Sequence, residues 1–146
     1  MANRIRLECP SLPENVGLAR IMVAALAAQA PFSLSDVEEV KVAVSEAVSN
    51  AVLHGYGGDP TGSVEVEASL VGEMLTVTVT DRGVGMEDLA LARQAASADP
   101  ERMGLGFVFM ETFMDSMEVE TWPHRGTVVR MRRRAKGPVP VPPDAR

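Results

Sequence analysis

The sequence has very little cysteine, no long apolar stretch and no excess of positive charge. Its single cysteine, Cys9, excludes an internal disulfide and is typical of a protein kept in a reducing compartment. The longest apolar run, residues 21–28, is far shorter than the roughly 20 residues that a membrane-spanning helix needs. It also lacks the preceding basic segment and the cleavage site of a secretory signal. We therefore expect a cytoplasmic protein with no membrane partner.

The acidic balance of charge excludes a further class of partner. The formal net charge is −6, whereas a general nucleic-acid-binding surface is basic. We therefore expect no direct contact with nucleic acid. Arginines at positions 130, 132, 133 and 134 form a local cluster, which we interpret as the solvated end of a strand.

The composition that remains is that of an ordinary globular domain. Hydrophobic residues make up 46% of the 146 residues and charged residues 23%, which suits one domain with one core. We place this domain at residues 1–136. Residues 137–146 contain four prolines and are predicted to form a disordered tail.

Hydrophobic periodicity predicts three helices and five strands. The first helix is expected at about residues 14–29, before Pro31, and the second from a capping box at Ser35 and Glu38 to about Leu53. Valine and alanine at positions 37, 40, 44, 48 and 51 form the predicted buried stripe of the second helix. The third helix is expected at residues 105–114. Strands are expected at 4–9, 63–71, 74–80, 119–122 and 127–132, with a β-hairpin formed by the second and third.

These elements predict an α/β fold, specifically an α+β two-layer sandwich. The helices would pack on one face of a mixed, mostly antiparallel sheet. Residues 86–103 are polar, rich in alanine and without a strong periodic stripe, which is typical of a mobile loop or lid.

Three short motifs carry the candidate chemistry, and the first contains Glu46 and Asn50. They lie one helical turn apart, on the side opposite the centre of the predicted core stripe. A glutamate there can accept a proton from a hydroxyl nucleophile or orient a water. The asparagine carbonyl is a hard, neutral oxygen that suits Mg²⁺. The alternative is a pair of polar residues on a solvated helix face.

The second motif places Asp81, Gly83 and Gly85 at the end of a predicted strand. A carboxylate there can accept a hydrogen bond from an exocyclic amine such as N6 of adenine, and the glycines allow close approach of the backbone. The alternative is an ordinary acid-glycine turn.

The third motif, Gly104-Leu105-Gly106, opens a helix whose free backbone amides form a ready phosphate site. Arg102 could reach a γ-phosphate, or it could be an exposed arginine of the loop. Thr127 could add a hydroxyl to a nucleotide pocket, although threonine in a strand needs no special explanation.

The ordered set of motifs is more specific than its members. The segments SEAVSNAVLHGYGGDP, TDRGVGM, ERMGLGFVFMETFMD and RGTVVRMR resemble the N, G1, G2 and last-strand elements of the GHKL ATPases. This superfamily includes the nucleotide domains of gyrase, Hsp90, histidine kinases and MutL, and the resemblance implies their Bergerat ATP-binding fold. The short length, the glutamate four residues before the asparagine and the following HGY resemble the anti-sigma serine kinases. The similarity covers about residues 4–134.

The resemblance implies a role for each matching residue. Glu46 would be the general base and Asn50 the Mg²⁺ ligand beside ATP or ADP. Asp81 would bind adenine with Gly83 and Gly85 beside it, and residues 86–103 would be the ATP lid. The remaining contacts to the nucleotide would come from Arg102 at the γ-phosphate, from Gly104, Leu105 and Gly106 at the phosphates, and from Thr127. Met103 stands where a small hydroxyl residue is common.

The resemblance also implies protein partners. Such proteins phosphorylate a serine on a small anti-anti-sigma protein and hold a sigma factor as a nucleotide-bound homodimer. Arg20 matches their partner-contacting arginine, although it could be a flanking charge on an alanine-rich helix.

Three functions follow as hypotheses. The leading one is a protein-serine kinase that also regulates a sigma factor. A nucleotide-gated binding module without physiological phosphotransfer is the second, and the same motifs serve it. The third is the ATP-binding domain of a histidine kinase, which we disfavour because no dimerisation-phosphoacceptor helix pair precedes the motifs.

Overall fold

The structure is a computed structural model that describes residues 2–86 and 103–137, the last with backbone alone at 103–105. Most of the predicted lid, including Arg102, lies outside these residues, as does the predicted tail after Gly137.

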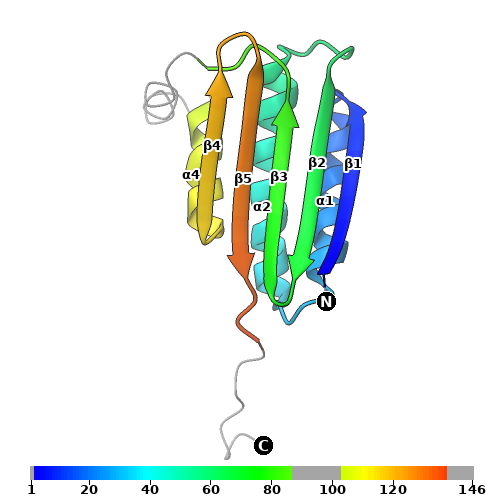
Figure 1. Cartoon of the computed structure of the whole chain (residues 1–146), viewed down its shortest axis with the longest axis vertical. Helices are drawn as coiled ribbons and strands as arrows, with labels where there is room; N and C mark the ends of the chain where they lie inside the picture. The colour runs from blue at the N-terminus through cyan, green and yellow to red at the C-terminus, as the bar shows by residue number, and fades with distance from the viewer. Residues whose placement is uncertain (1, 87–102, 138–146) are drawn as a thin grey trace, which may run out of the picture.

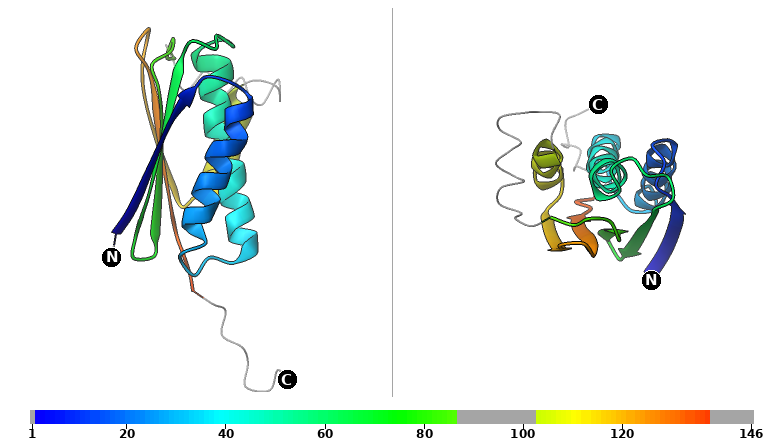
Figure 2. Two further views of the ribbon diagram at one scale, coloured as in Figure 1. Left: turned by 90° about the vertical axis from the view of Figure 1, so that its right-hand side faces the viewer. Right: turned by 90° about the horizontal axis from the view of Figure 1, so that it is seen from above.

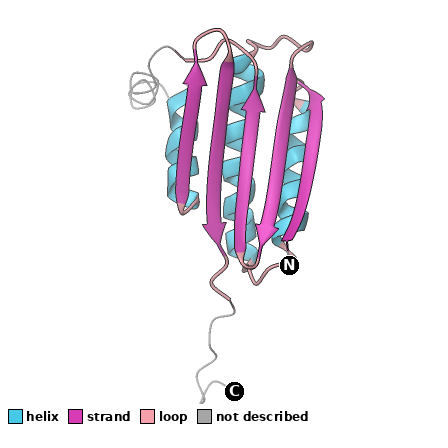
Figure 3. Cartoon of the chain, viewed as in Figure 1, coloured by secondary structure: helices cyan, strands magenta, loops and turns pink. Residues whose placement is uncertain are grey.

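A single antiparallel sheet forms one layer of the described chain, and helices form the other (Figures 1 and 3). Its five strands are β1 (Ala2–Pro10), β2 (Ser63–Val71), β3 (Met74–Asp81), β4 (Ser116–Trp122) and β5 (Gly126–Arg134), in the spatial order β1-β2-β3-β5-β4. The helices α1 (Glu14–Ala27), α2 (Leu34–Asn50) and α4 (Met103–Phe113) all cover one face, as Figure 2 shows edge-on. The predicted two-layer sandwich is confirmed, and every described strand pair is antiparallel.

Strict alternation along β2 and β3 builds the core under α2. Val66 pairs with Val79 and Ala68 with Val77, and all four side chains are buried against the helices. Val40, Val44 and Val48 of α2 are fully buried above them, as the predicted stripe requires, whereas Val37 is only partly buried. On the opposite face of the sheet, exposed ion pairs such as Arg6–Glu65 contribute little to stability.

Helix α2 begins two residues earlier than predicted. Its capping box consists of Ser33 and Asp36, not Ser35 and Glu38, and Ser33 has the extended backbone of an N-cap. The sequence contains both serine-acid patterns. The earlier start places the Asp36 carboxylate 2.5 Å from the guanidinium of Arg133, a contact that favours it over the later one.

The end of α2 also departs from the predicted single helix to Leu53. The α-helix ends at Asn50 and continues as one π-helical turn, η1 (Ala51–Gly55), closed by a hydrogen bond from the Tyr56 N–H to the Ala51 carbonyl. Such turns are rare and occur often at functional sites.

The arginine cluster at the end of β5 is not uniformly solvated. Arg133 is buried and donates to Asp36, to Glu39 and to the Phe113 carbonyl, so the prediction is wrong for this residue. Its neighbours Arg130 and Arg132 pair with Glu118 on the exposed face of the sheet. Over the described residues, no helix combines the length and the apolarity needed to cross a membrane.

Candidate functional site

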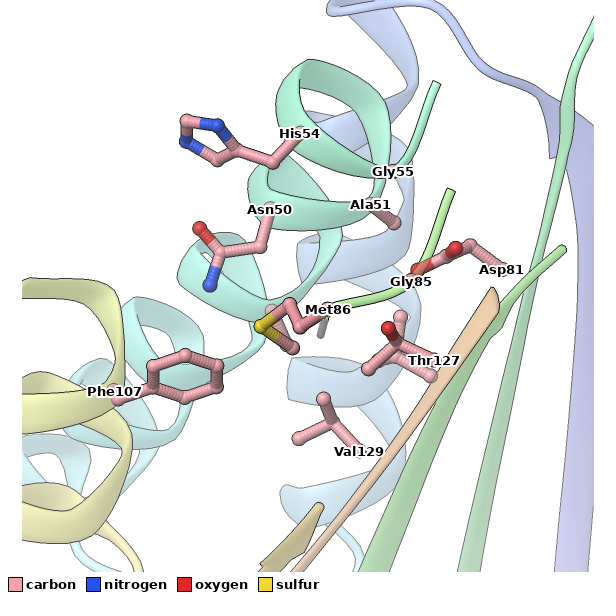
Figure 4. Close-up of a pocket in the computed structure, with 12 residues that line it drawn as sticks. Asn50, Ala51, His54, Gly55, Asp81, Gly85, Met86, Phe107, Thr127 and Val129 are labelled. Atoms are coloured by element: carbon pink, nitrogen blue, oxygen red, sulfur yellow. The ribbon is translucent and has the colours of Figure 1, made fainter. Parts of the chain in front are cut away.

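The three motifs meet at the end of the sandwich where β3 and α2 both finish. A pocket of about 20 Å³ opens between them. Its lining comes from α2, η1, β3, the loop after β3, α4 and β5: Ala47, Asn50, Ala51, His54, Gly55, Val79, Asp81, Gly85, Met86, Phe107, Thr127 and Val129 (Figure 4). This volume holds little more than one water, so a larger ligand requires side chains such as Met86 to turn aside.

The first and third motifs are in direct contact. A Cβ atom added to Gly106 of α4 would lie 3.1 Å from the Glu46 carboxylate oxygen and 3.1 Å from Asn50 Nδ2. Any larger residue at position 106 would therefore displace these two side chains. Burial raises the pKa of Glu46 above its ordinary value, which brings this carboxylate closer to the pKa of a useful general base.

The second motif places a buried carboxylate on the sheet wall of the pocket. Asp81 is 7% exposed and accepts a hydrogen bond from the Gly83 N–H at 2.9 Å. Burial raises the pKa of Asp81, although backbone hydrogen bonds from Gly83 and Thr127 oppose the rise. Beside it, a side chain on Gly55 would meet the Asp81 carboxylate at 2.8 Å. Because Asp81 lines the pocket, its carboxylate can accept a hydrogen bond from a ligand there.

The path of the loop after β3 requires glycine at two positions, 83 and 85. At Gly83 a Cβ would overlap the Gly55 carbonyl, and the next N–H, that of Val84, donates to this same carbonyl at 2.8 Å. Gly85 has a positive φ of 67° and lies against the Trp122 carbonyl, where a side chain would clash. Both glycines of the motif therefore shape the pocket edge.

Comparison with known proteins agrees with this geometry. Residues 9–133 match the family model of the histidine kinase-like ATPase domain. An anti-sigma F factor of Clostridium perfringens (strain SM101 / Type A) is 42% identical over 137 residues, which cover 92% of this chain and 98% of the relative. That of Geobacillus kaustophilus (strain HTA426) is 39% identical over 91% of this chain and 93% of the relative. The chain belongs to the anti-sigma F factor family, within the histidine kinase-like ATPases.

Solved structures show the same fold. A crystal structure of the RsbU and RsbW domains of a Mycobacterium tuberculosis protein matches 90% of this chain with a TM-score of 0.65 and 23% identity. A blue-light activated histidine kinase of Erythrobacter litoralis matches 86% with a TM-score of 0.56 and 20% identity. The chain spans 32% and 42% of these two longer chains. The match of residues 9–133 to the histidine kinase-like ATPase domain implies that this protein binds a nucleotide.

The residues fit a single-ligand Mg²⁺ site better than a metal cage. Among residues 2–86 and 103–137 no three His, Cys, Asp or Glu side chains gather at one point. Mg²⁺ takes most of its ligands from water and substrate phosphates, so one protein oxygen suffices. Asn50 borders the pocket, and its buried Nδ2 has no partner among the described residues. Because the amide can turn to present Oδ1, Asn50 fits the role that the resemblance implies.

Of the other predicted site residues, two are described by their backbone alone and one lies outside the pocket. Gly104 and Leu105 lie in the first turn of α4, where the structure describes their backbone only. Arg20 lies outside the pocket, in a separate groove of about 320 Å³ between α1 and α2. Lys41, Ser45 and Glu46 line this groove as well, so Glu46 faces the groove from which Arg20 approaches.

Two polar residues at or beside the pocket were not among the predicted site residues. His54, four residues after Asn50, lines the pocket, and burial lowers its pKa, which favours the neutral imidazole. Its spacing from Asn50 was a usable signal. Thr121 of β4 bonds the Thr127 hydroxyl at 3.0 Å and accepts the Met86 N–H at 2.8 Å. Threonine in a strand gives no such signal in the sequence.

Proposed function

We propose that the protein is an anti-sigma factor that binds and inhibits a sporulation sigma factor and, with Mg-ATP, phosphorylates a serine on an anti-anti-sigma partner. The relatives' name supports the regulatory part. The position of Glu46 supports the kinase part. A Cβ added to Gly106 would lie 3.1 Å from the Glu46 carboxylate and 3.1 Å from Asn50, and Glu46 also lines the Arg20 groove. A base in that place can reach both a bound nucleotide and a docked protein.

Each residue would act as follows. Asp81 accepts a hydrogen bond from the adenine amine, and the backbone amides of the first turn of α4, at Gly104 to Gly106, hold the phosphates. Mg²⁺ held by Asn50 would neutralise charge on the β- and γ-phosphates. Arg102 would complete the γ-phosphate contacts.

In the transfer step Glu46 takes the proton of the acceptor serine hydroxyl as that oxygen bonds to the γ-phosphorus. The bond between the γ-phosphorus and the β–γ bridging oxygen breaks, and ADP leaves with its electron pair. The raised pKa of Glu46 suits this proton transfer because it narrows the gap to the serine hydroxyl.

The assembly is part of the proposal. We propose that Arg20 contacts the protein partners from its groove, and that the sigma factor is held by a homodimer in the cytoplasm. One ATP-binding domain, residues 1–136, would carry all these functions, with residues 137–146 as a tail outside it.

The decisive variant is Glu46→Gln. Mixed with Mg-ATP and the anti-anti-sigma protein, it should transfer phosphate at least about 100-fold more slowly than wild type, because a general base contributes 10²–10⁴-fold. Its affinity for ATP should stay close to that of wild type. Glu73→Gln, in the β2–β3 turn at the opposite end of the sheet, is the matched control and should transfer phosphate normally.

The same assay separates the alternatives. Full transfer by Glu46→Gln would show that the base is misassigned. If the wild-type protein retains the sigma factor in ATP but never phosphorylates the acceptor, it is a nucleotide-gated binding module. Acid-labile product on His54 or His124 would instead favour histidine-kinase chemistry.

A further inference from the structure

The hydroxyl of Thr121 joins two walls of the pocket. It lies on the helix-facing side of β4, directly across the strand pair from Thr127. Its oxygen accepts the Met86 N–H at 2.8 Å and lies 3.0 Å from the Thr127 hydroxyl oxygen. Met86 and Thr127 both line the pocket, whereas Thr121 does not. Within the described residues, the hydrogen bonds of Thr121 to pocket-lining residues are these two.

The hydrogen-bond capacity of Thr121 determines what Thr127 offers to a ligand. A hydroxyl has one proton to donate, and that of Thr121 has two acceptors nearby, the Thr127 hydroxyl at 3.0 Å and the Gly126 carbonyl at 3.3 Å. Either hydroxyl of the Thr121–Thr127 pair can be the donor. Hydroxyl hydrogen bonds are normally 2.5–3.0 Å long, and the 3.0 Å separation from Thr127 fits this range better than the 3.3 Å separation from the Gly126 carbonyl. In the arrangement with Thr121 as donor to Thr127, Thr127 accepts, and its own proton can be donated into the pocket.

A donor at Thr127 complements the acceptor beside it. Thr127 is the register partner of Asp81, so the two side chains stand next to each other on the sheet wall (Figure 4). An acceptor beside a donor matches the edge of adenine that carries the N6 amine and the ring nitrogen N1. Hypoxanthine has the opposite pattern, so its O6 acceptor would face the acceptor Asp81.

We propose that Thr121 is a positioning residue that fixes the Thr127 hydroxyl as a donor to adenine N1 and holds Met86 at the pocket edge. This inference rests on the nucleotide binding within the proposed function. It assigns to Thr121 a share in base selectivity, although it touches no ligand itself.

The test compares affinities for ATP and 1-deaza-ATP, which lacks the N1 acceptor, by calorimetry. Wild type should prefer ATP. Thr121→Val keeps the shape but removes the hydroxyl, and we expect the preference to fall about three- to tenfold, the worth of one hydrogen bond. Thr121→Ser should restore it, and Thr127→Val should reproduce the loss. Thr78→Val, the same change on the exposed face of β3, should leave the preference at the wild-type value.

A second readout needs no nucleotide. In the free protein the Met86 amide should exchange its hydrogen about five- to tenfold faster in Thr121→Val than in wild type, because its acceptor is gone. If Thr121→Val does not fold, Thr127→Val still tests the inference, which fails if that variant keeps the wild-type preference for ATP. An unchanged preference in Thr121→Val would overturn the inference alone, whereas absence of ATP binding by wild type would overturn the proposed function.

Discussion

The two ends of the layer formed by α2 and α4 bury polar groups in opposite ways. At the lower end in Figure 1, the Arg133 guanidinium donates to Glu39 at 2.7 Å, to the Phe113 carbonyl at 2.6 Å and to Asp36. At the upper end, Asn50 Nδ2 is buried with no partner among the described residues, and Glu46 has a raised pKa because burial disfavours its charge. At the lower end the buried guanidinium is paired, whereas at the upper end Asn50, beside the pocket, and Glu46, beside the Arg20 groove, are desolvated without such a partner among the described residues.

The difference separates stability from function within one pair of helices. Arg133 donates to the Phe113 carbonyl at the C-terminus of α4 and pairs with Asp36 and Glu39 near the N-terminus of α2. The dipoles of both helices favour charges of these signs at these ends. An unsatisfied buried polar group costs about 1–3 kcal/mol, so the upper end destabilises the fold unless a ligand binds there. We expect substitutions at the lower end to change stability and those at the upper end to change catalysis.

The largest effect is expected from Arg133→Met. Methionine fills a similar volume but leaves Asp36 and Glu39 without their cation, and breaking a buried ion pair in this way costs several kcal/mol. Because both carboxylates are partly exposed, we expect a loss of about 2–3 kcal/mol in the free energy of unfolding, measured by urea denaturation.

Arg134→Met is the control for that change. Arg134 is the next residue of β5, and its side chain is exposed, so its replacement should change stability by less than about 0.5 kcal/mol. Equal destabilisation by the two variants would mean that charge on β5, rather than the contacts of Arg133, stabilises this end.

At the upper end, Gly106→Ala should lower activity without lowering stability. Alanine in a helix is favoured over glycine by about 0.5–1 kcal/mol, which offsets the strain of a Cβ 3.1 Å from Glu46 and Asn50. These two side chains must shift by a few tenths of an ångström, and we expect phosphotransfer to slow about tenfold. Urea denaturation and the acceptor assay on one preparation measure both quantities.

Gly17→Ala in α1 makes the same chemical change where space allows it. The added Cβ would meet only the Arg20 side chain, at an ordinary 3.7 Å. Normal transfer by this variant would assign the loss in Gly106→Ala to contact with Glu46 and Asn50. Normal transfer by Gly106→Ala itself would contradict the close packing of the first and third motifs.

The order of apolar and polar residues alternates along β2 and β3, and this alternation determines which side chains face the helices. The sheet could therefore be predicted from the sequence, and so could the side of the sheet on which Asp81 lies. Once Val66 faces the core, so do Val79 and Val77, and Asp81 must then end β3 on the helix side. The end of α2 was not predictable in the same way. A π-helical turn has no strong residue preference, and Tyr56 stabilises it by a tertiary bond, since its hydroxyl donates to the Ser63 carbonyl and accepts the Arg82 N–H.

The buried contacts of Arg133 and the role of Thr121 depend on partners far away in the sequence. Arg133 meets Asp36 and Glu39 across 97 and 94 positions, and Thr121 meets Met86 across 35. In the sequence alone, nothing distinguishes Arg133 from the other arginines of its cluster or Thr121 from any threonine in a strand. Only the packing of β5 under α2, and of β4 beside the loop after β3, gives them distinct roles.

The smallest expected effect is a pH-dependent change in Tm when one carboxylate of α2 is neutralised. The change is expected to be a gain at the upper end and a loss at the lower end. A raised pKa means that the folded state favours protonated Glu46, so ionisation of this residue destabilises the fold as the pH rises through that pKa. Glu46→Gln should therefore raise Tm at pH 7–8, and the gain should vanish below the ordinary glutamate value of 4.5. Equal Tm values at pH 8 would mean that Glu46 is not desolvated.

Asp36→Asn gives the opposite dependence at the lower end. Burial alone would raise the pKa of Asp36, but hydrogen bonds from Ser33 and the charge of Arg133 outweigh it and lower the pKa. The ionised carboxylate therefore stabilises the fold above its ordinary value of 3.8, and this stabilisation is lost as the pH falls through the lowered pKa. Asp36→Asn should lower Tm at pH 7, and the deficit should shrink toward acid. Because Glu46→Gln and Asp36→Asn remove the same charge from the same helix, a parallel response in both would show that net charge, not pairing, distinguishes its two ends.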